Sequence, residues 1–305
     1  MKAMWLFSES NHRFVPPMHR RICAMGQFLL YEMEMQMKKK GIGKVSAWYI
    51  ILKIVMIVLI IFFLTDAVMQ FISYRFYKGN WKKDEVPYAP VKLQINEDLT
   101  GYGYNLEKES DRIVLFFGGS MYIAYNTVGM YGGKFDCPFL SVDYYGSQDS
   151  KGKMNVRTMQ QSAEDLYDYA VAKYPGKDVY VIGHSYGCGM AAYLASAREC
   201  EHLFLASGYR TSADMYNKII PIFWGPLTVF IKNNVRVDLY AENTTCPVTV
   251  IGSDADTTLD DKLQLKLADC YTKAECKIFH GISHEDYFTT DEVVEYVRGI
   301  MEKNR

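Results

Sequence analysis

Ser185 stands at the centre of the pentapeptide Gly183-His184-Ser185-Tyr186-Gly187, which follows an apolar stretch. A serine hydroxyl becomes a nucleophile when a neighbouring base removes its proton. The G-x-S-x-G pattern places such a serine on a sharp, strained turn between a strand and a helix. The turn leaves little room for side chains two residues away, which explains glycine on both sides. We therefore predict that Ser185 is a catalytic nucleophile.

A serine nucleophile needs a general base, and His284 in Gly281-Ile282-Ser283-His284, after the last expected strand, is one candidate. An ordinary imidazole has a pKa of about 6.5, so it can take up the serine proton and return it to the leaving group. Two other histidines compete. His280 lies at the end of an expected strand and reads as packed or solvated, and His184 inside the pentapeptide reads as a packing residue.

The third member of such a triad is a carboxylate that orients the histidine and stabilises the imidazolium. The segment Gly252-Ser253-Asp254-Ala255-Asp256 offers two. Spacing alone does not separate Asp254 from Asp256, so both are candidates at this point.

Other chemistries fit these residues less well. Asp254-Ala255-Asp256-Thr257-Thr258 also resembles the D-x-D-x-T motif of haloacid-dehalogenase-type phosphatases, but that motif opens its domain and needs more chain than follows here. The loop lacks the glycine and spaced ligands of an EF-hand. The cysteines include no C-x-x-C pair and no metal-like histidine spacing beside them, so we expect no zinc site or other metal site. The chemistry of a serine nucleophile implies no cofactor. Cys270 and Cys276 could pair in an oxidising compartment, or both could be buried small hydrophobes.

The elements around these residues alternate between strand and helix, which predicts an α/β fold with a mostly parallel sheet and helices on both faces. Residues 91–96 and 103–106 read as an antiparallel pair. We expect a helix after a capping box that starts at Thr158 and ends at Gln161, stopping before Pro175. The other expected strands cover 112–117, 138–143, 178–182, 202–206, 248–252 and 276–279, and the other expected helices cover 188–198, 260–268 and 291–303.

Composition limits the possible partners. The 305 residues are 49% hydrophobic and 23% charged, with a formal net charge of −1. Such a chain can bury one large core, and nothing in its charge favours nucleic acid. We see no internal repeats.

Residues 48–66 form a nearly continuous apolar run that only Lys53 interrupts before Asp66. More than ten Ile, Leu, Val and Phe residues outweigh one lysine, which lies towards one end and can snorkel. We predict a membrane anchor at 48–73, over the alternatives of a cleaved signal peptide and a buried core helix.

The basic cluster Lys38-Lys39-Lys40 precedes this run, so the positive-inside rule predicts a cytoplasmic amino terminus and an extracytoplasmic catalytic domain. The expected organisation is a tail at 1–47, the anchor at 48–73, a linker at 74–90 and an α/β domain at 91–305. Residues 1–36 could also reflect an upstream start assignment.

The order of elements and motifs resembles the α/β-hydrolase superfamily over about residues 91–305. In that family the loop after the third strand, here Phe116-Phe117-Gly118-Gly119-Ser120, supplies an oxyanion-hole amide. The resemblance implies the backbone N–H groups of Ser120 and Tyr186 as the two donors. The family's usual His-Gly is Gly118-Gly119 here, which leaves the first donor open. Asp143, at the exit of the next strand, reads as structural.

The resemblance also implies His284 as the general base, because Ser283-His284 resembles the family's Ser-His loop after the last strand. For the acid, one inserted residue after Gly252 would bring Asp256 to the family's usual position, so we favour Asp256 and keep Asp254 as the alternative.

An apolar insertion between Gly208 and Tyr240 stands where this family carries its cap, which we place at 209–240. It could be either an acyl-binding lid or a small cap that packs on the core.

We expect a membrane-anchored serine hydrolase that cleaves esters or thioesters of apolar, lipid-like acyl groups, with the lipid bilayer as its other partner. The alternatives are a peptidase or amidase with the same triad, and a binding module without catalysis. The oligomeric state stays open.

Overall fold

A computed structural model gives the structure of the chain, which divides into two compact units, Met1–Phe63 and Leu64–Arg305. Most of the predicted tail, residues 1–47, lies outside the described residues and stays a prediction. The structure describes residues 27–28, 31–32, 35–36, 47–77, 82–219, 221–232 and 234–303.

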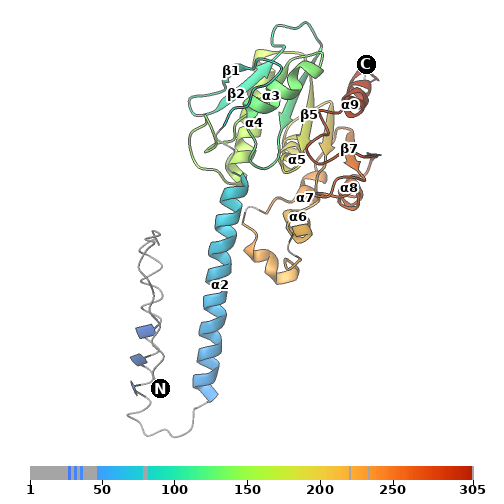
Figure 1. Ribbon diagram of the computed structural model, residues 1–305. Coiled ribbons are helices and arrows are strands. Elements are labelled where there is room, and N and C mark those ends of the chain that lie inside the picture. The colour runs from blue at the N-terminus through green and yellow to red at the C-terminus, as the bar shows by residue number, and fades with distance from the viewer. Residues whose placement is uncertain are drawn as a thin grey trace, which may run out of the picture. The chain divides into compact units, whose positions relative to one another are not determined.

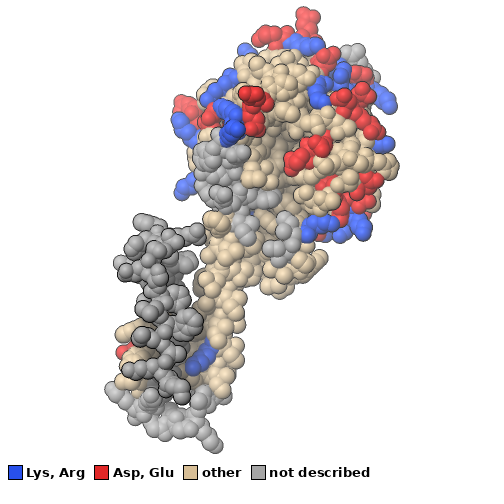
Figure 2. All heavy atoms as spheres, in the orientation of Figure 1, with Lys and Arg blue, Asp and Glu red and all other residues tan. Residues whose placement is uncertain are grey.

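Helix α2, Ala47–Tyr77, contains the predicted anchor and continues past its expected end at residue 73. Its segment Trp48–Phe71, 24 residues with mean hydropathy 2.7, is long and apolar enough to cross a membrane. At 1.5 Å per residue it reaches about 36 Å, more than the roughly 30 Å hydrocarbon layer. Its most apolar part is not buried against other described residues, unlike a core helix. Few charged side chains mark its surface in Figure 2.

Lys53 directs its ammonium group along this helix towards the amino-terminal end. Its Nζ atom lies 4.3 Å from the centroid of the Tyr49 ring, one turn earlier. The charge is thereby carried away from the centre of the apolar span, as expected of a snorkelling lysine.

An eight-stranded sheet forms the α/β domain, in the order β1-β2-β4-β3-β5-β6-β7-β8. The pairs β1–β2 and β2–β4 are antiparallel, and every other neighbouring pair is parallel. The predicted fold class is therefore confirmed (Figure 1). The strands are β1 Val91–Gln94, β2 Thr100–Tyr104, β3 Arg112–Phe117, β4 Phe139–Val142, β5 Asp178–His184, β6 His202–Ala206, β7 Val248–Ser253 and β8 Ala274–Phe279.

Side-chain alternation along β5 shows that helices cover both faces of the sheet. The Tyr180 hydroxyl donates to the carbonyl of Met301 in helix α9, Asp291–Lys303. Gly183, an odd number of residues later, faces the opposite side, where an added Cβ would come within 2.8 Å of Ala191 Cβ in helix α5, Gly187–Ala197. Strand β5 is buried from its second residue onward, as a central parallel strand must be.

Helix α4, Val156–Lys173, begins earlier than predicted, so the expected capping box at Thr158 was misplaced. The cap is Asn155, whose side-chain oxygen accepts from the Thr158 amide at 3.1 Å. The Thr158 hydroxyl accepts from the Asn155 amide at 3.0 Å, so threonine fills the position that glutamate or glutamine usually takes. The apolar face of the helix, with Ala163 and Leu166, is buried on the domain.

Several short helices carry no clear periodic signal and were not predicted, and most lie in the cap or beside the site. The remaining helices are α3 Ala124–Tyr131, η1 Gly132–Lys134, α4 Val156–Lys173, α6 Ser212–Ile219, η2 Gly225–Phe230, α7 Val237–Ala241 and α8 Asp261–Ala268.

Candidate active site

Ser185 lies on the turn between β5 and α5 in a left-handed conformation, with φ of +54°. Its amide donates to the carbonyl of Ala206 at 2.9 Å, which ties the turn to the neighbouring strand. Gly187 packs so closely on the Phe117 carbonyl that any Cβ would overlap it, and a Cβ on Gly183 would come within 2.6 Å of Cys188 Cα. Both glycines are therefore required by close backbone approach.

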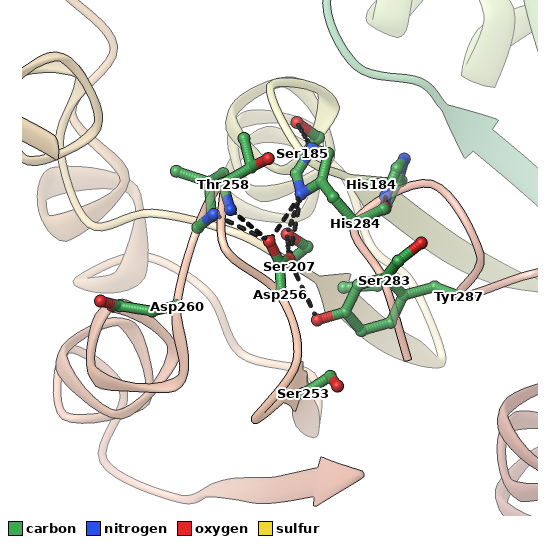
Figure 3. Close-up of polar contacts among 12 residues, drawn as sticks. His184, Ser185, Ser207, Ser253, Asp256, Thr258, Asp260, Ser283, His284 and Tyr287 are labelled. Atoms are coloured by element: carbon green, nitrogen blue, oxygen red, sulfur yellow. Dashed lines mark hydrogen bonds and ion pairs between the residues drawn. The ribbon is translucent and has the colours of Figure 1, made fainter. Parts of the chain in front are cut away.

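The structure brings the three predicted residues together from three loops at the carboxyl ends of the strands (Figure 3). The Ser185 Oγ atom lies 2.9 Å from His284 Nε2. On the other side of the same ring, His284 Nδ1 lies 3.0 Å from Asp256 Oδ2. This geometry lets His284 accept a proton from the serine while Asp256 holds the opposite nitrogen.

Four donors besides the histidine hold the Asp256 carboxylate. The backbone amides of Thr258 and Leu259 each donate to Oδ1 at 2.9 Å. The hydroxyls of Ser207 and Tyr287 donate to Oδ2 at 2.5 Å and 3.2 Å. The side chain can therefore be fully buried as an anion, because its lone pairs are satisfied.

These contacts decide the ionisation of Asp256. Burial alone would raise the pKa of this carboxyl group, but the hydrogen bonds from His284, Ser207 and the Leu259 amide outweigh it and lower the pKa to about 2. The carboxylate stays negative across the pH range in which a histidine exchanges protons.

Ser207 is a site residue that the sequence did not reveal. It follows β6 directly and has φ of +49°, a conformation uncommon for a residue with a side chain. Its Oγ atom lies 2.9 Å from His284 Nδ1 as well as within bonding distance of Asp256. The only sequence signal was its place at the carboxyl end of a central strand, where such folds gather their site residues.

Asp254 and His280, the alternatives to Asp256 and His284 in the sequence, contact each other and not Ser185. Asp254 Oδ2 lies 2.7 Å from His280 Nδ1, and the Gly281 amide donates to Asp254 Oδ1 at 2.9 Å. The hydrogen bond from His280, followed by the one from the Gly281 amide, lowers the pKa of Asp254. The His280 side chain is 89% exposed, so this pair lies on the surface.

His184 does more than fill space within the turn. Its Nε2 atom lies 2.9 Å from the backbone carbonyl oxygen of His284, so the neutral ring can donate to the loop that carries the predicted base. Burial lowers the pKa of His184 to about 4, with the neighbouring His284 as the next contribution. The ring therefore remains neutral near pH 7 and keeps its donor.

The loop after β3 lies beside the predicted nucleophile. A Cβ added to Gly119 would stand 3.0 Å from Ser185 Cβ and 3.3 Å from its Oγ, so only glycine leaves this approach free. Ser120, the predicted amide donor, is the next residue, and Tyr186, the other one, opens α5 as its N-cap. The two backbone segments expected to form an oxyanion hole thus flank Ser185.

Asp143 has a structural environment. It is almost fully buried, and its Oδ1 atom accepts from the Ala124 amide at the start of α3 at 2.9 Å. Burial raises the pKa of Asp143 to about 6. The contact fixes the start of a helix, which fits the structural reading of this residue.

The insertion between β6 and β7 contains both kinds of apolar residue that the sequence left open. Phe223, Ile231 and Val235 are buried and support a cap packed on the domain. Trp224 and Val229 are 62% and 60% exposed. Apolar surface thus remains available around η2 for an acyl chain or a lipid layer.

Among the described residues, no group of three or more His, Cys, Asp or Glu side chains could hold a metal ion.

Comparison with known proteins identifies relatives in fold and sequence. No model of a known protein family matches the chain. A curated relative, the lysophosphatidylserine lipase ABHD12 of Danio rerio, is 29% identical over 159 residues, which cover 47% of this chain and 41% of that protein. The chain thus matches under half the length of this relative.

Solved structures resemble the α/β domain over most of its length. The esterase Pf2001 of Pyrococcus furiosus has a TM-score of 0.58 at 15% identity, covering 75% of this chain and 96% of its own. An α/β-hydrolase fold protein of Chitinophaga pinensis has a TM-score of 0.54 at 12% identity, covering 72% and 99%. The order of the strands in the sheet and these solved structures show that the chain has the α/β-hydrolase fold.

Proposed function

We propose that this protein is a membrane-anchored serine hydrolase that cleaves an ester or thioester of an apolar acyl group. The observation that carries the proposal is the continuous hydrogen-bonded chain from Ser185 Oγ through His284 to Asp256. A serine held at a strained turn, with a base on one side and a buried carboxylate behind that base, is arranged for acyl transfer.

The reaction follows from these contacts. His284 Nε2 takes the Ser185 proton as Oγ attacks the acyl carbonyl, and Asp256 stabilises the imidazolium that forms. Backbone amides of the loop at Gly119 and Ser120 and of Tyr186 would hold the developing oxyanion. The imidazolium then protonates the leaving alcohol or thiol. In the second half, His284 activates a water molecule that releases the acyl group from Ser185.

Covalent labelling tests this assignment. A fluorophosphonate probe should label the full-length protein at Ser185, and Ser185→Ala should abolish both labelling and turnover. Ser283→Ala is the matched control, because the Ser283 hydroxyl lies in the same region but donates to Asp286. Full labelling of Ser185→Ala would show that another residue is the nucleophile.

A substrate panel tests the acyl specificity. The exposed apolar side chains at Trp224 and Val229 favour long acyl groups over acetyl. Since a relative is a lysophosphatidylserine lipase, the panel should include a single-acyl glycerophospholipid beside simple esters, thioesters and anilides of graded chain length. A higher kcat/KM for anilides than for esters would favour an amidase, and no turnover despite labelling would favour a binding role.

We infer the orientation of the domain from charge and the candidate span. Trp48–Phe71 can cross a membrane, and the lysine cluster at 38–40 precedes it. In this orientation the α/β domain faces away from the cytoplasm. Protease added to intact cells should digest the domain and leave the amino-terminal part protected. Complete protection of the domain would reverse the orientation, and extraction by alkaline carbonate would contradict a membrane span.

A further inference from the structure

Two cysteines meet at the end of the sheet opposite the candidate active site. Cys200 lies between α5 and β6, and Cys246 lies just before β7. Their Sγ atoms are 3.0 Å apart, although both residues are free thiols. Each is half-buried, so small reagents can approach the pair.

The backbone around the two thiols is already aligned for a covalent bond. Strands β6 and β7 are parallel neighbours, with Leu203 paired to Val248. The Leu203 amide donates to the Pro247 carbonyl at 3.0 Å, directly beside Cys246. Neighbouring strands lie about 4.8 Å apart, within the Cα separation that disulfides span. The sulfurs need to approach by only about 1 Å more to reach bonding distance.

We propose that Cys200 and Cys246 are a modification site that closes to a disulfide in the working protein. The oxidant is a disulfide-bearing exchange partner, such as an oxidised dithiol protein or oxidised glutathione. The thiolate of one cysteine attacks the partner's disulfide and forms a mixed disulfide, releasing one partner thiol. The second cysteine then attacks the mixed disulfide, forms the Cys200–Cys246 bond and releases the other thiol. The protein loses two electrons and two protons, and the partner gains them.

The contact between the thiols supports this chemistry. The Cys200 thiol donates to Cys246 Sγ, and this hydrogen bond lowers the pKa of the Cys246 thiol. Thiolates are the attacking species in disulfide exchange, so Cys246 is the expected first nucleophile.

The disulfide would covalently join the two ends of the segment that contains the cap. It would close a loop that contains β6, Ser207 and the whole insertion from residue 208 to residue 240. The triad residues follow the carboxyl ends of β5, β7 and β8, whereas the cysteines precede β6 and β7. The link should therefore raise thermal stability without changing the chemical step. An outward-facing domain, which is part of the proposed function, would meet the oxidising conditions that form such a bond.

Peptide mapping tests the proposal directly on the full-length, detergent-solubilised protein. Oxidation should be carried out with excess oxidised glutathione before digestion with trypsin. Complete cleavage places Cys200, Cys246, Cys270 and Cys276 in the separate peptides 199–210, 237–262, 267–273 and 274–277. Mass spectrometry should find peptides 199–210 and 237–262 joined with the loss of two hydrogens. Oxidised protein in which these peptides remain unlinked, or in which peptides 267–273 and 274–277 are joined instead, would overturn the proposal.

The measurable consequence of the disulfide is a shift in the midpoint of thermal unfolding. Closing a loop of this length should raise the midpoint of the oxidised protein by about 5–10 °C over the reduced protein. Cys200→Ala and Cys246→Ala should abolish the shift, and Cys270→Ala and Cys276→Ala are the matched controls that keep it. Should an alanine variant fail to fold, the wild-type peptide map still decides.

A last variant separates this proposal from the proposed function. Ser185→Ala should form the Cys200–Cys246 link as readily as the wild type, because the nucleophile takes no part in it. Failure of the link in both proteins contradicts the disulfide alone, whereas failure of labelling at Ser185 contradicts the hydrolase alone.

Discussion

Two aspartate–histidine pairs lie on the same two loops, and only one of them contacts the candidate nucleophile Ser185. Asp254 and His280 are 2.7 Å apart, closer than Asp256 and His284 at 3.0 Å. The side chains of the first pair are 47% and 89% exposed, and those of the second pair are 0% and 13% exposed. The shorter contact is therefore the surface one, so the distance between the two side chains does not distinguish the pair beside Ser185.

Burial and the number of donors separate the two pairs. Water screens an exposed pair and makes its contribution small. Inside the domain, Asp256 needs its four further donors to remain charged, and the carboxylate in turn fixes His284 for the serine. The comparison suggests four experiments, in order of decreasing effect.

Replacement of the histidines should give the largest difference. We expect His284→Ala to lower kcat by about 10⁵-fold or more, because Ser185 loses its base. His280→Ala should stay within about twofold of wild type. The measurement is steady-state hydrolysis of a chromogenic acyl ester by both variants. Equal losses would mean that the surface pair also serves the reaction.

Replacement of the aspartates should give the next largest difference. Asp256→Asn keeps the shape but removes the charge that orients the imidazole, so kcat should fall by about 10⁴-fold. Asp254→Asn should change kcat by less than about threefold. The ratio of the two kcat values is the readout, and a ratio inverted in favour of Asp254 would reassign the acid.

Removal of a supporting hydroxyl should have a moderate effect. A hydrogen bond to a charged group contributes about 1.5–3 kcal/mol, so Ser207→Ala should lower kcat by about 10- to 100-fold if that bond also acts in the transition state. KM should change little, because Ser207 is completely buried behind the triad. Tyr287→Phe should lose less, as its bond is longer. A Ser207→Ala enzyme with wild-type kcat would show that the other donors suffice.

The pH dependence of stability should show the smallest effect. The pKa of His184 falls to about 4 on folding, below the ordinary 6.5, so the unfolded chain binds more protons between these values. The contribution of neutral His184 to the free energy of unfolding is complete above pH 6.5 and is lost as the pH falls towards 4. From pH 7 to pH 5 the loss should be about 2 kcal/mol.

Urea unfolding at the two pH values measures this contribution. His184→Gln retains a donor for the His284 carbonyl but does not titrate, so its free energy of unfolding should fall by about 2 kcal/mol less than that of the wild type. His280→Gln is the matched control for replacing a histidine by glutamine, because the His280 side chain is exposed and lies outside the buried site. Parallel curves for wild type and His184→Gln would contradict the buried neutral histidine.

The sequence predicted the central architecture because its signals there are local. The apolar runs that became β3 and β6 and the amphipathic pattern of α9 matched their observed bounds. The start of α4 was wrong because Asn155 and Thr158 form a capping box with an unusual residue in the second position. The short helices of the cap were not predicted, because a few residues are too short a stretch to show a helical periodicity.

The candidate site was predictable only where chemistry leaves a pattern. Ser185 stands in a fixed motif, and His284 and Asp256 occupy expected places in the chain order. Ser207 and Tyr287 carry no motif, since their role depends on tertiary contacts with Asp256. The pairing of Cys200 with Cys246 was likewise hidden, because it depends on which strands are neighbours.

The wide sequence separation within the candidate site has a consequence for biosynthesis. Ser185 and His284 are 99 residues apart, and the histidine follows β8, which joins the sheet at its edge. In a chain made from its amino terminus, the candidate membrane span in α2 is complete long before that histidine is synthesised. Contacts between distant residues also form late and slowly in folding. We therefore expect the nascent protein to have no hydrolytic activity until its carboxyl-terminal segment has been synthesised and folded.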